Sequence, residues 1–172
     1  MQHGARLGRR DTERASVANL VETVIAVDDK RVPAGYSQNP LSTKLGVKSG
    51  HVVALLRAPD GWSIPAPPRV ETRRDLRKQP DIVLAFVRSL ADLRRQRQRL
   101  VAALRAEDSL WLVRPRKAGG HVSDVSEQAL RDEFLSTGLV DNKVASLDDD
   151  WSALRFVWRR ENRTSRGSST KR

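Results

Sequence analysis

Two short apolar runs constrain the fold of this chain more than any other feature of its sequence. The first covers residues 51–56 and reads H-V-V-A-L-L, and the second covers residues 81–87 and reads D-I-V-L-A-F-V. A strand with one face in water alternates apolar and polar side chains, whereas these runs are apolar at nearly every position. Such strands are buried on both faces, as in a parallel sheet that other layers cover. We therefore expect the core of an α/β domain.

The segments around these runs predict helices and a third buried strand. Apolar residues at helical spacing follow Ser89, a suitable N-cap, and continue to about Arg105. Residues 110–113 predict the third strand, and a second helix begins at Ser123 or Ser126 and closes before Gly138. Strands that alternate with helices are typical of a mostly parallel sheet with right-handed crossovers.

The last part of the domain predicts an antiparallel hairpin. Residues 140–147 and 151–159 are strand-like and are joined by a turn of aspartates. Shorter elements are expected earlier in the chain: a helical turn over 40–45 with Asn39 as its cap, and a short, exposed strand over 70–73. The predicted fold is α/β: a three-layer, Rossmann-like, mostly parallel sheet that ends in an antiparallel hairpin.

The two ends of the chain differ from this central part. Residues 1–35 are expected to be a poorly ordered extension with one amphipathic helix, because apolar residues between Val17 and Ile25 recur at helical spacing. A helix that docks onto a partner is the alternative for this segment. Residues 161–172 contain no apolar side chain and are expected to be a disordered basic tail. The Rossmann-like domain then covers residues 36–160.

Composition excludes several classes of site. The chain has no cysteine, which excludes disulfides, thiolate nucleophiles and Cys-ligated zinc and weakly favours a cytoplasmic location. No apolar run approaches the roughly 18 residues of a membrane-spanning helix, so no membrane partner is expected. His3, His51 and His121 lack the spacing of metal ligands, and no serine stands in a G-x-S-x-G turn. We therefore assign no metal site and no catalytic residue.

Several motifs resemble known families. Residues 81–84, 100–115 and 151–157 resemble the fourth strand, the following helix with the fifth strand, and the closing hairpin of class I methyltransferases, which have a Rossmann-like fold. Residues 36–159 more closely resemble an uncharacterised family, domain of unknown function 3052, in the pieces 41–46, 58–61, 115–117, 138–144 and 151–156. No activity is established for that family, so the resemblance implies a methyltransferase-like fold and no particular function.

The cofactor motif of a methyltransferase is missing from this resemblance. A nucleotide-binding turn needs glycines after the first strand, so that the backbone can approach the ligand. After Leu56 the chain reads R-A-P-D-G, and the short segment between Asp60 and Asp81 leaves little room for the elements that would complete the cofactor half. Glu71 is the nearest acid to the end of a second strand, but it lies inside that strand. The sequence therefore predicts no cofactor, and S-adenosylmethionine is not expected to bind.

Basic side chains form the first group of candidate binding residues. The chain carries 32 Lys and Arg against 21 Asp and Glu, for a formal net charge of +11. Arg94, Arg95, Arg97 and Arg99 crowd one predicted helix and are candidate contacts for a nucleic-acid backbone. Because no known nucleic-acid-binding motif accompanies them, we expect such binding to be weak and non-specific.

A second group of cations predicts a site for a small anion. Arg116 and Lys117 follow the third strand, at the edge where open α/β sheets bind ligands, and Lys143 and Arg155 lie on the predicted hairpin. The alternative is that these residues cap helix ends and brace the hairpin. The sequence favours a non-enzymatic, methyltransferase-like binding or regulatory module whose partner is unknown. A basic nucleic-acid-associated protein is the alternative function, and an enzyme of unrecognised chemistry comes third.

Overall fold

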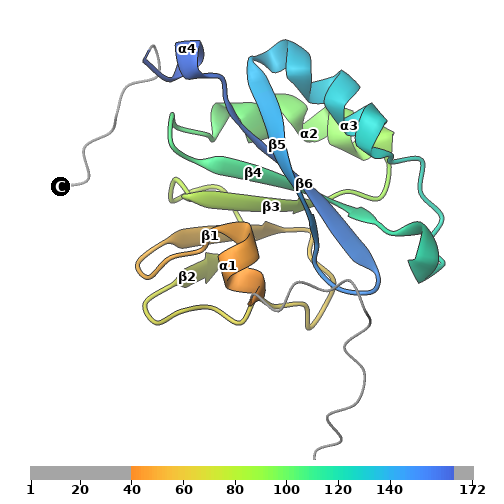
Figure 1. The fold of residues 1–172 in the computed structure, drawn as a ribbon, viewed down its shortest axis with the longest axis horizontal. Helices are drawn as coiled ribbons and strands as arrows, with labels where there is room; N and C mark the ends of the chain where they lie inside the picture. The colour runs from red at the N-terminus through yellow and green to blue at the C-terminus, as the bar shows by residue number, and fades with distance from the viewer. Residues whose placement is uncertain (1–39, 165–172) are drawn as a thin grey trace, which may run out of the picture. The chain divides into compact units, whose positions relative to one another are not determined.

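A computed structural model describes residues 40–164 of the chain and shows a single mixed sheet. Its six strands lie in the order β2-β1-β3-β4-β6-β5 (Figure 1). Their bounds are Val52–Leu56 (β1), Glu71–Arg73 (β2), Ile82–Phe86 (β3), Ser109–Pro115 (β4), Leu139–Ser146 (β5) and Trp151–Trp158 (β6). The pairs β1–β2, β1–β3 and β3–β4 are parallel, whereas β6 is antiparallel to both β4 and β5. The predicted α/β fold class, with its closing hairpin, is confirmed.

Four α-helices accompany the described part of the sheet: Leu41–Leu45 (α1), Leu90–Ala102 (α2), Glu127–Phe134 (α3) and Arg160–Arg163 (α4). Ser89 caps α2, since its Oγ accepts a hydrogen bond from the Asp92 N–H, and Ser126 caps α3 in the same way. Of the two predicted caps of α3, Ser123 instead donates its hydroxyl to the carbonyl of Arg88. The expected cap of α1, Asn39, lies outside the described residues, and Pro40 occupies the N-cap position.

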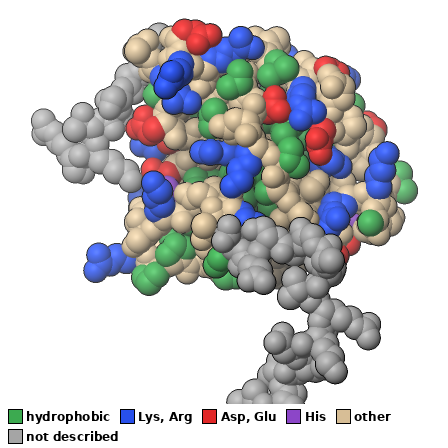
Figure 2. All heavy atoms as spheres, in the orientation of Figure 1, with side chains coloured by type: hydrophobic (Ala, Val, Ile, Leu, Met, Phe, Trp, Pro, Cys, Tyr) green, Lys and Arg blue, Asp and Glu red, His purple; other side chains and the backbone are tan. Residues whose placement is uncertain are grey.

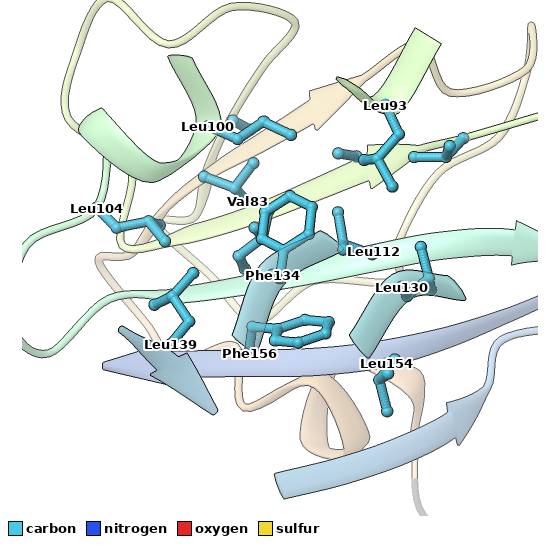
Figure 3. Close-up of a cluster of buried hydrophobic side chains, with 14 of the residues drawn as sticks. Val83, Leu93, Leu100, Leu104, Leu112, Leu130, Phe134, Leu139, Leu154 and Phe156 are labelled. Atoms are coloured by element: carbon cyan, nitrogen blue, oxygen red, sulfur yellow. The ribbon is translucent and has the colours of Figure 1, made fainter. Parts of the chain in front are cut away.

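The strands are buried on both faces, and each face has its own core. On one face α2 and α3 pack against alternate strand residues, with Val83, Leu112 and Phe156 among the buried side chains (Figure 3). On the other face α1 and the loop 57–70 cover Phe86, Trp111 and their neighbours. The result is the predicted three-layer arrangement, in which one outer layer is a short helix and a loop.

The two connections that leave β1 and β3 pass over opposite faces of the sheet. The loop after β1 packs Trp62 and Ile64 on the α1 face, while β3 leads through Ser89 into α2 on the other face. Between β1 and β3 the described chain contains β2 and turns but no helix. The short connection expected from the sequence is therefore present.

The expected carboxyl-terminal boundary of the domain, residue 160, coincides with the start of helix α4. Helix α4 begins at Arg160 and continues to Arg163, into the segment 161–172 that was expected to be a disordered basic tail. Asn162 Nδ2 donates to the carbonyl of Gly138 at 3.1 Å, and Arg163 Nε donates to that of Trp158 at 3.0 Å. The predicted extension 1–35 and the rest of the tail lie outside the described residues. None of the helices in the described part of the chain has the length and apolarity needed to cross a membrane.

Charged side chains join the strands at the amino edge of the sheet. Arg105 donates through Nε and Nη2 to both carboxylate oxygens of Asp108 at 2.9 Å, and its Nη2 also lies 3.2 Å from Asp81. Asp81 accepts the backbone N–H of Val52 at 2.7 Å. The hydrogen bonds to Asp108 raise the pKa of Arg105, whereas burial raises the pKa of the Asp108 carboxyl and outweighs the opposing effect of Arg105. Arg105 therefore supplies the positive charge that offsets the burial of the Asp108 carboxylate.

We predict that Arg105→Met destabilises the domain by about 3–5 kcal/mol, because Asp108 would remain buried without its cation. Arg95→Met is the matched control, since Arg95 is mostly exposed and its ion pair with Asp92 should contribute at most about 1 kcal/mol. Urea unfolding measures both free energies. A loss below about 1 kcal/mol for Arg105→Met would show that the amino-edge ion pair does not hold the strands.

Candidate functional site

A cavity of about 390 Å³ lies at the carboxyl ends of β1 and β3. The connections from these strands diverge to opposite faces here, which is the place where open α/β sheets bind ligands. The volume is within the range of small-molecule sites. We call this cavity the crevice, and its lining residues are Arg57, Ala58, Pro59, Asp60, Phe86, Arg88 and Asp92.

Charged groups of both signs surround the crevice. Arg57, just after β1, forms an ion pair across it, with Nη1 at 3.1 Å from Asp92 Oδ2 in the first turn of α2. Arg88, just after β3, places its guanidinium 5.5 Å from the centroid of the Trp151 ring. Asp60 is exposed and has no hydrogen-bond or ion-pair partner among residues 40–164. The crevice therefore offers two guanidinium groups and two carboxylates to a ligand.

The backbone turn that follows β1 is tight, although residues 57–60 contain no glycine. Arg57 itself adopts a φ of 55°, in the left-handed region that glycine normally occupies, and Gly61 follows with a φ of 75°. A non-glycine residue in this region is strained, and such strain is often found at functional sites. The chain thus makes a left-handed turn here without glycine, but the Cβ and side chain of Arg57 remain in the lining of the crevice. Pro59 still supplies no N–H group to a ligand.

Phe86 is the aromatic residue that lines the crevice, and it packs against two tryptophans. Phe86 makes edge contacts with Trp62 and Trp151, with ring centroids 4.8 and 5.1 Å apart. Trp62 Nε1 donates to Asp148 Oδ2 at 2.8 Å, which attaches the loop after β1 to the hairpin turn. Because these contacts of Trp62 hold the loop against the sheet and the hairpin turn, we infer that the crevice is formed before any ligand binds.

The structure separates the four cations that were predicted to bind an anion. Arg116 Nη1 donates to the Asp148 carbonyl at 3.0 Å and to Ser146 Oγ at 3.3 Å, which braces the hairpin turn. Lys117 is exposed beside it, and both residues line another cavity of about 250 Å³.

Lys143 and Arg155 instead face each other in the middle of the hairpin. Lys143 Nζ donates to the carbonyl of Lys44 at the end of α1, at 2.7 Å. The Arg155 guanidinium lies 6.0 Å from the centroid of Trp111, and burial lowers its pKa. The two predicted pairs therefore do not form one site, and their binding of an anion stays a prediction.

Acidic side chains compensate most of the basic residues on α2. Arg94 Nε and Arg97 Nη1 lie 2.6 and 3.2 Å from the carboxylate of Glu133 on α3, and Arg95 pairs with Asp92. Figure 2 shows basic and acidic side chains interspersed over the visible face of the domain. Among these arginines only Arg99 has no partner within residues 40–164. The four residues therefore do not form a continuous positive surface.

Comparisons with known proteins concern the fold. No family model matches the chain, and no curated protein matches it. Among solved structures, a mutant of MtNAS has 11% sequence identity and a TM-score of 0.43. The match covers 69% of this chain and 57% of the MtNAS chain. A structure of LepI in complex with SAH and a substrate analogue has 13% identity and a TM-score of 0.43, with 77% and 50% covered. A structure of LepI in complex with SAM has 14% identity and a TM-score of 0.41, with 69% and 39% covered. The chain spans little more than half, or less, of each matched chain.

The expectation of a non-enzymatic binding module, with a basic nucleic-acid-associated protein as its alternative, is corrected by these matches. The matched chains include one described as a pericyclic reaction enzyme, and LepI is described with SAH and with SAM. At such low identity and structural similarity the matches concern the architecture alone, and they assign no ligand to this chain.

The residues of the crevice were not singled out from the sequence as a site. Arg57 and Arg88 each follow a strongly apolar strand directly, and this position was the available signal. The same position after the third strand is the basis for the prediction of Arg116 and Lys117. The crevice also depends on the side of the sheet on which the connections from β1 and β3 run, and local sequence does not give that side.

We predict that Arg57→Gly leaves the free energy of unfolding within about 1 kcal/mol of the wild type. Relief of the left-handed conformation, about 1–2 kcal/mol, is offset by greater freedom of the unfolded chain and by loss of an exposed ion pair. Arg69→Gly is the matched control, because Arg69 has a φ of 64° but lies outside the crevice. Thermal and urea unfolding compare the two variants. A loss above about 2 kcal/mol for Arg57→Gly alone would show that Arg57 has mainly a structural role.

Proposed function

We propose that the crevice binds a nucleoside that carries an anionic group, and that the protein is an enzyme that uses this ligand as cofactor or substrate. The observation that carries the proposal is the pre-formed cavity at the point where the connections from β1 and β3 diverge, crossed by the Arg57–Asp92 pair. Ligands of open α/β sheets bind at this position because both loops and the N-terminus of the following helix can reach them.

The side chains around the crevice match the parts of such a ligand. A carboxylate that follows a parallel strand accepts hydrogen bonds from ribose hydroxyls, and Asp60 and Asp92 can take this role. Guanidinium groups bind carboxylates or phosphates with two parallel hydrogen bonds, which suits Arg57 and Arg88. Phe86 supplies an apolar floor, of the kind that lines most small-molecule pockets.

S-adenosylmethionine is one nucleoside of this class, since it combines a ribose with an amino-acid carboxylate. The left-handed turn at Arg57 and the two carboxylates fit it, whereas Pro59 removes a backbone donor and the Arg57 side chain narrows the approach. Adenosine monophosphate has the same ribose and a phosphate in place of the carboxylate. Both compounds therefore test the shared chemistry, and a difference between them would identify the anionic group.

We also propose that the chain is a member of the family domain of unknown function 3052. Two of the matching pieces lie at the carboxyl edge of the sheet, residues 58–61 in the wall of the crevice and residues 115–117 at the end of β4. The cytoplasmic location expected from the sequence stays a prediction.

We predict saturable binding of S-adenosylmethionine or adenosine monophosphate to the full chain in isothermal titration. Asp60→Asn and Arg88→Gln should each weaken this binding about tenfold or more, because each removes a charged hydrogen-bonding group. Asp132→Asn, an exposed position on α3 outside the crevice, is the control and should bind as the wild type does. The absence of binding by the wild type, or an equal loss in all three variants, would contradict the proposal.

A further inference from the structure

A second cavity, of about 220 Å³, lies on the α2 face of the sheet beside Arg57. Its apolar lining comes from Leu56, Leu76 and Leu100, which belong to or pack against the core under α2. Its polar lining consists of Arg57, Arg74, Arg99 and Gln96. We call this cavity the arginine pocket. Among the described residues that line it there is no acid.

The three guanidinium groups reach the arginine pocket from separate elements. Arg57 follows β1, Arg74 follows β2, and Arg99 lies in the last turn of α2. The parallel pairing of β1 with β2 places the first two at neighbouring strand ends, and packing of α2 over this part of the sheet adds the third. No local sequence motif produces this arrangement.

The positive charge of the arginine pocket is only partly compensated by the protein. Arg57 Nη1 lies 3.1 Å from Asp92 Oδ2 across the crevice, and Asp92 also pairs with Arg95. Arg74 Nη1 donates to a neutral acceptor, the carbonyl of Ala58, at 3.2 Å, and Arg99 has no partner within residues 40–164. Each guanidinium has five N–H donors, so most of the donors around the cavity remain available to a ligand. Like charges held around one small cavity repel each other unless an anion lies between them.

We propose that the arginine pocket binds the phosphate or diphosphate group of a small phosphorylated ligand. Guanidinium groups form charge-assisted, bidentate hydrogen bonds with phosphate oxygens, and clustered arginines are typical of phosphate recognition. The three leucines limit access of water from the inner side, which strengthens each of these hydrogen bonds. The cavity has room for one such group and not for a nucleic-acid strand.

The inference does not require the proposed function of the crevice, because the probe for it contains no nucleoside. It does extend that proposal, since Arg57 borders both cavities. The two proposed sites are therefore neighbours at Arg57, and a nucleotide is the class of ligand that combines their chemistry.

Inorganic pyrophosphate and inorganic phosphate, titrated into the full chain at constant ionic strength, test the arginine pocket. We expect saturable binding of at least one of them, weakened about tenfold or more by Arg74→Gln and by Arg99→Gln. Arg94→Gln is the control, because it makes the same charge change on the same helix. Wild-type Arg94 pairs with Glu133 and lies outside the arginine pocket, so binding should be unaffected. No binding by the wild type, or an equal loss in Arg94→Gln, would overturn the proposal. Binding of a short oligonucleotide without binding of pyrophosphate would overturn it as well.

A double comparison separates this inference from the proposed function. Arg99→Gln should lose pyrophosphate binding and retain binding of adenosine, whereas Asp60→Asn should do the reverse. Thermal unfolding of each variant verifies that the fold is intact. Loss of pyrophosphate binding in Asp60→Asn but not in Arg99→Gln would place the phosphate site in the crevice and overturn the inference. Failure of adenosine to bind, with pyrophosphate binding intact, would count against the crevice alone.

Discussion

Strands β1, β3 and β4 are apolar on both faces, and the chain must cover both faces with few residues. Helices α2 and α3 cover one side, and their leucines and Phe134 form a continuous core with the strands. For the other side the chain uses α1 and the loop 57–70, whose Trp62 and Ile64 replace a helix. This loop starts at the end of β1 and lies on the face of the sheet opposite to the connection that follows β3. The opening between them is therefore a direct consequence of how the sheet is covered.

Arg57 stands at the point where the two connections diverge, and both cavities depend on it. Its left-handed backbone turns the chain from the strand into the loop, and its side chain crosses to Asp92 on α2. Phe86, which lines the crevice, belongs to the core on the α1 face, and Leu100, which lines the arginine pocket, belongs to the core on the α2 face. Arg57 lines both the mixed-charge site and the cationic site.

Charge on this protein is better understood pair by pair than as a total. The basic stripe on α2 lies beside Glu133 and Asp92, so most of its charge is compensated at short range. Arg105 is similarly committed to Asp108 and Asp81 at the amino edge. Within residues 40–164, Arg74 and Arg99 have no acidic partner, because no acidic residue lines the arginine pocket. The high net charge therefore indicates less about partners than the position of these few residues.

Local sequence determined most of the secondary structure: the buried strands, the serine caps of α2 and α3, and the hairpin all follow from neighbouring residues. Local sequence also located Arg116 and Lys117 at the end of a strand, but it did not show that Arg116 would be used to hold the hairpin turn. Nor did it show that Arg57 would adopt the left-handed conformation that glycine normally adopts, because a strained φ is imposed by the surrounding fold. Tertiary structure alone decided that Arg57, Arg74 and Arg99 line one pocket while Lys143 and Arg155 lie apart from Arg116. Such proximity depends on strand order and on the side taken by each connection, and these are set by the burial of both faces of the sheet rather than by any short stretch of the chain.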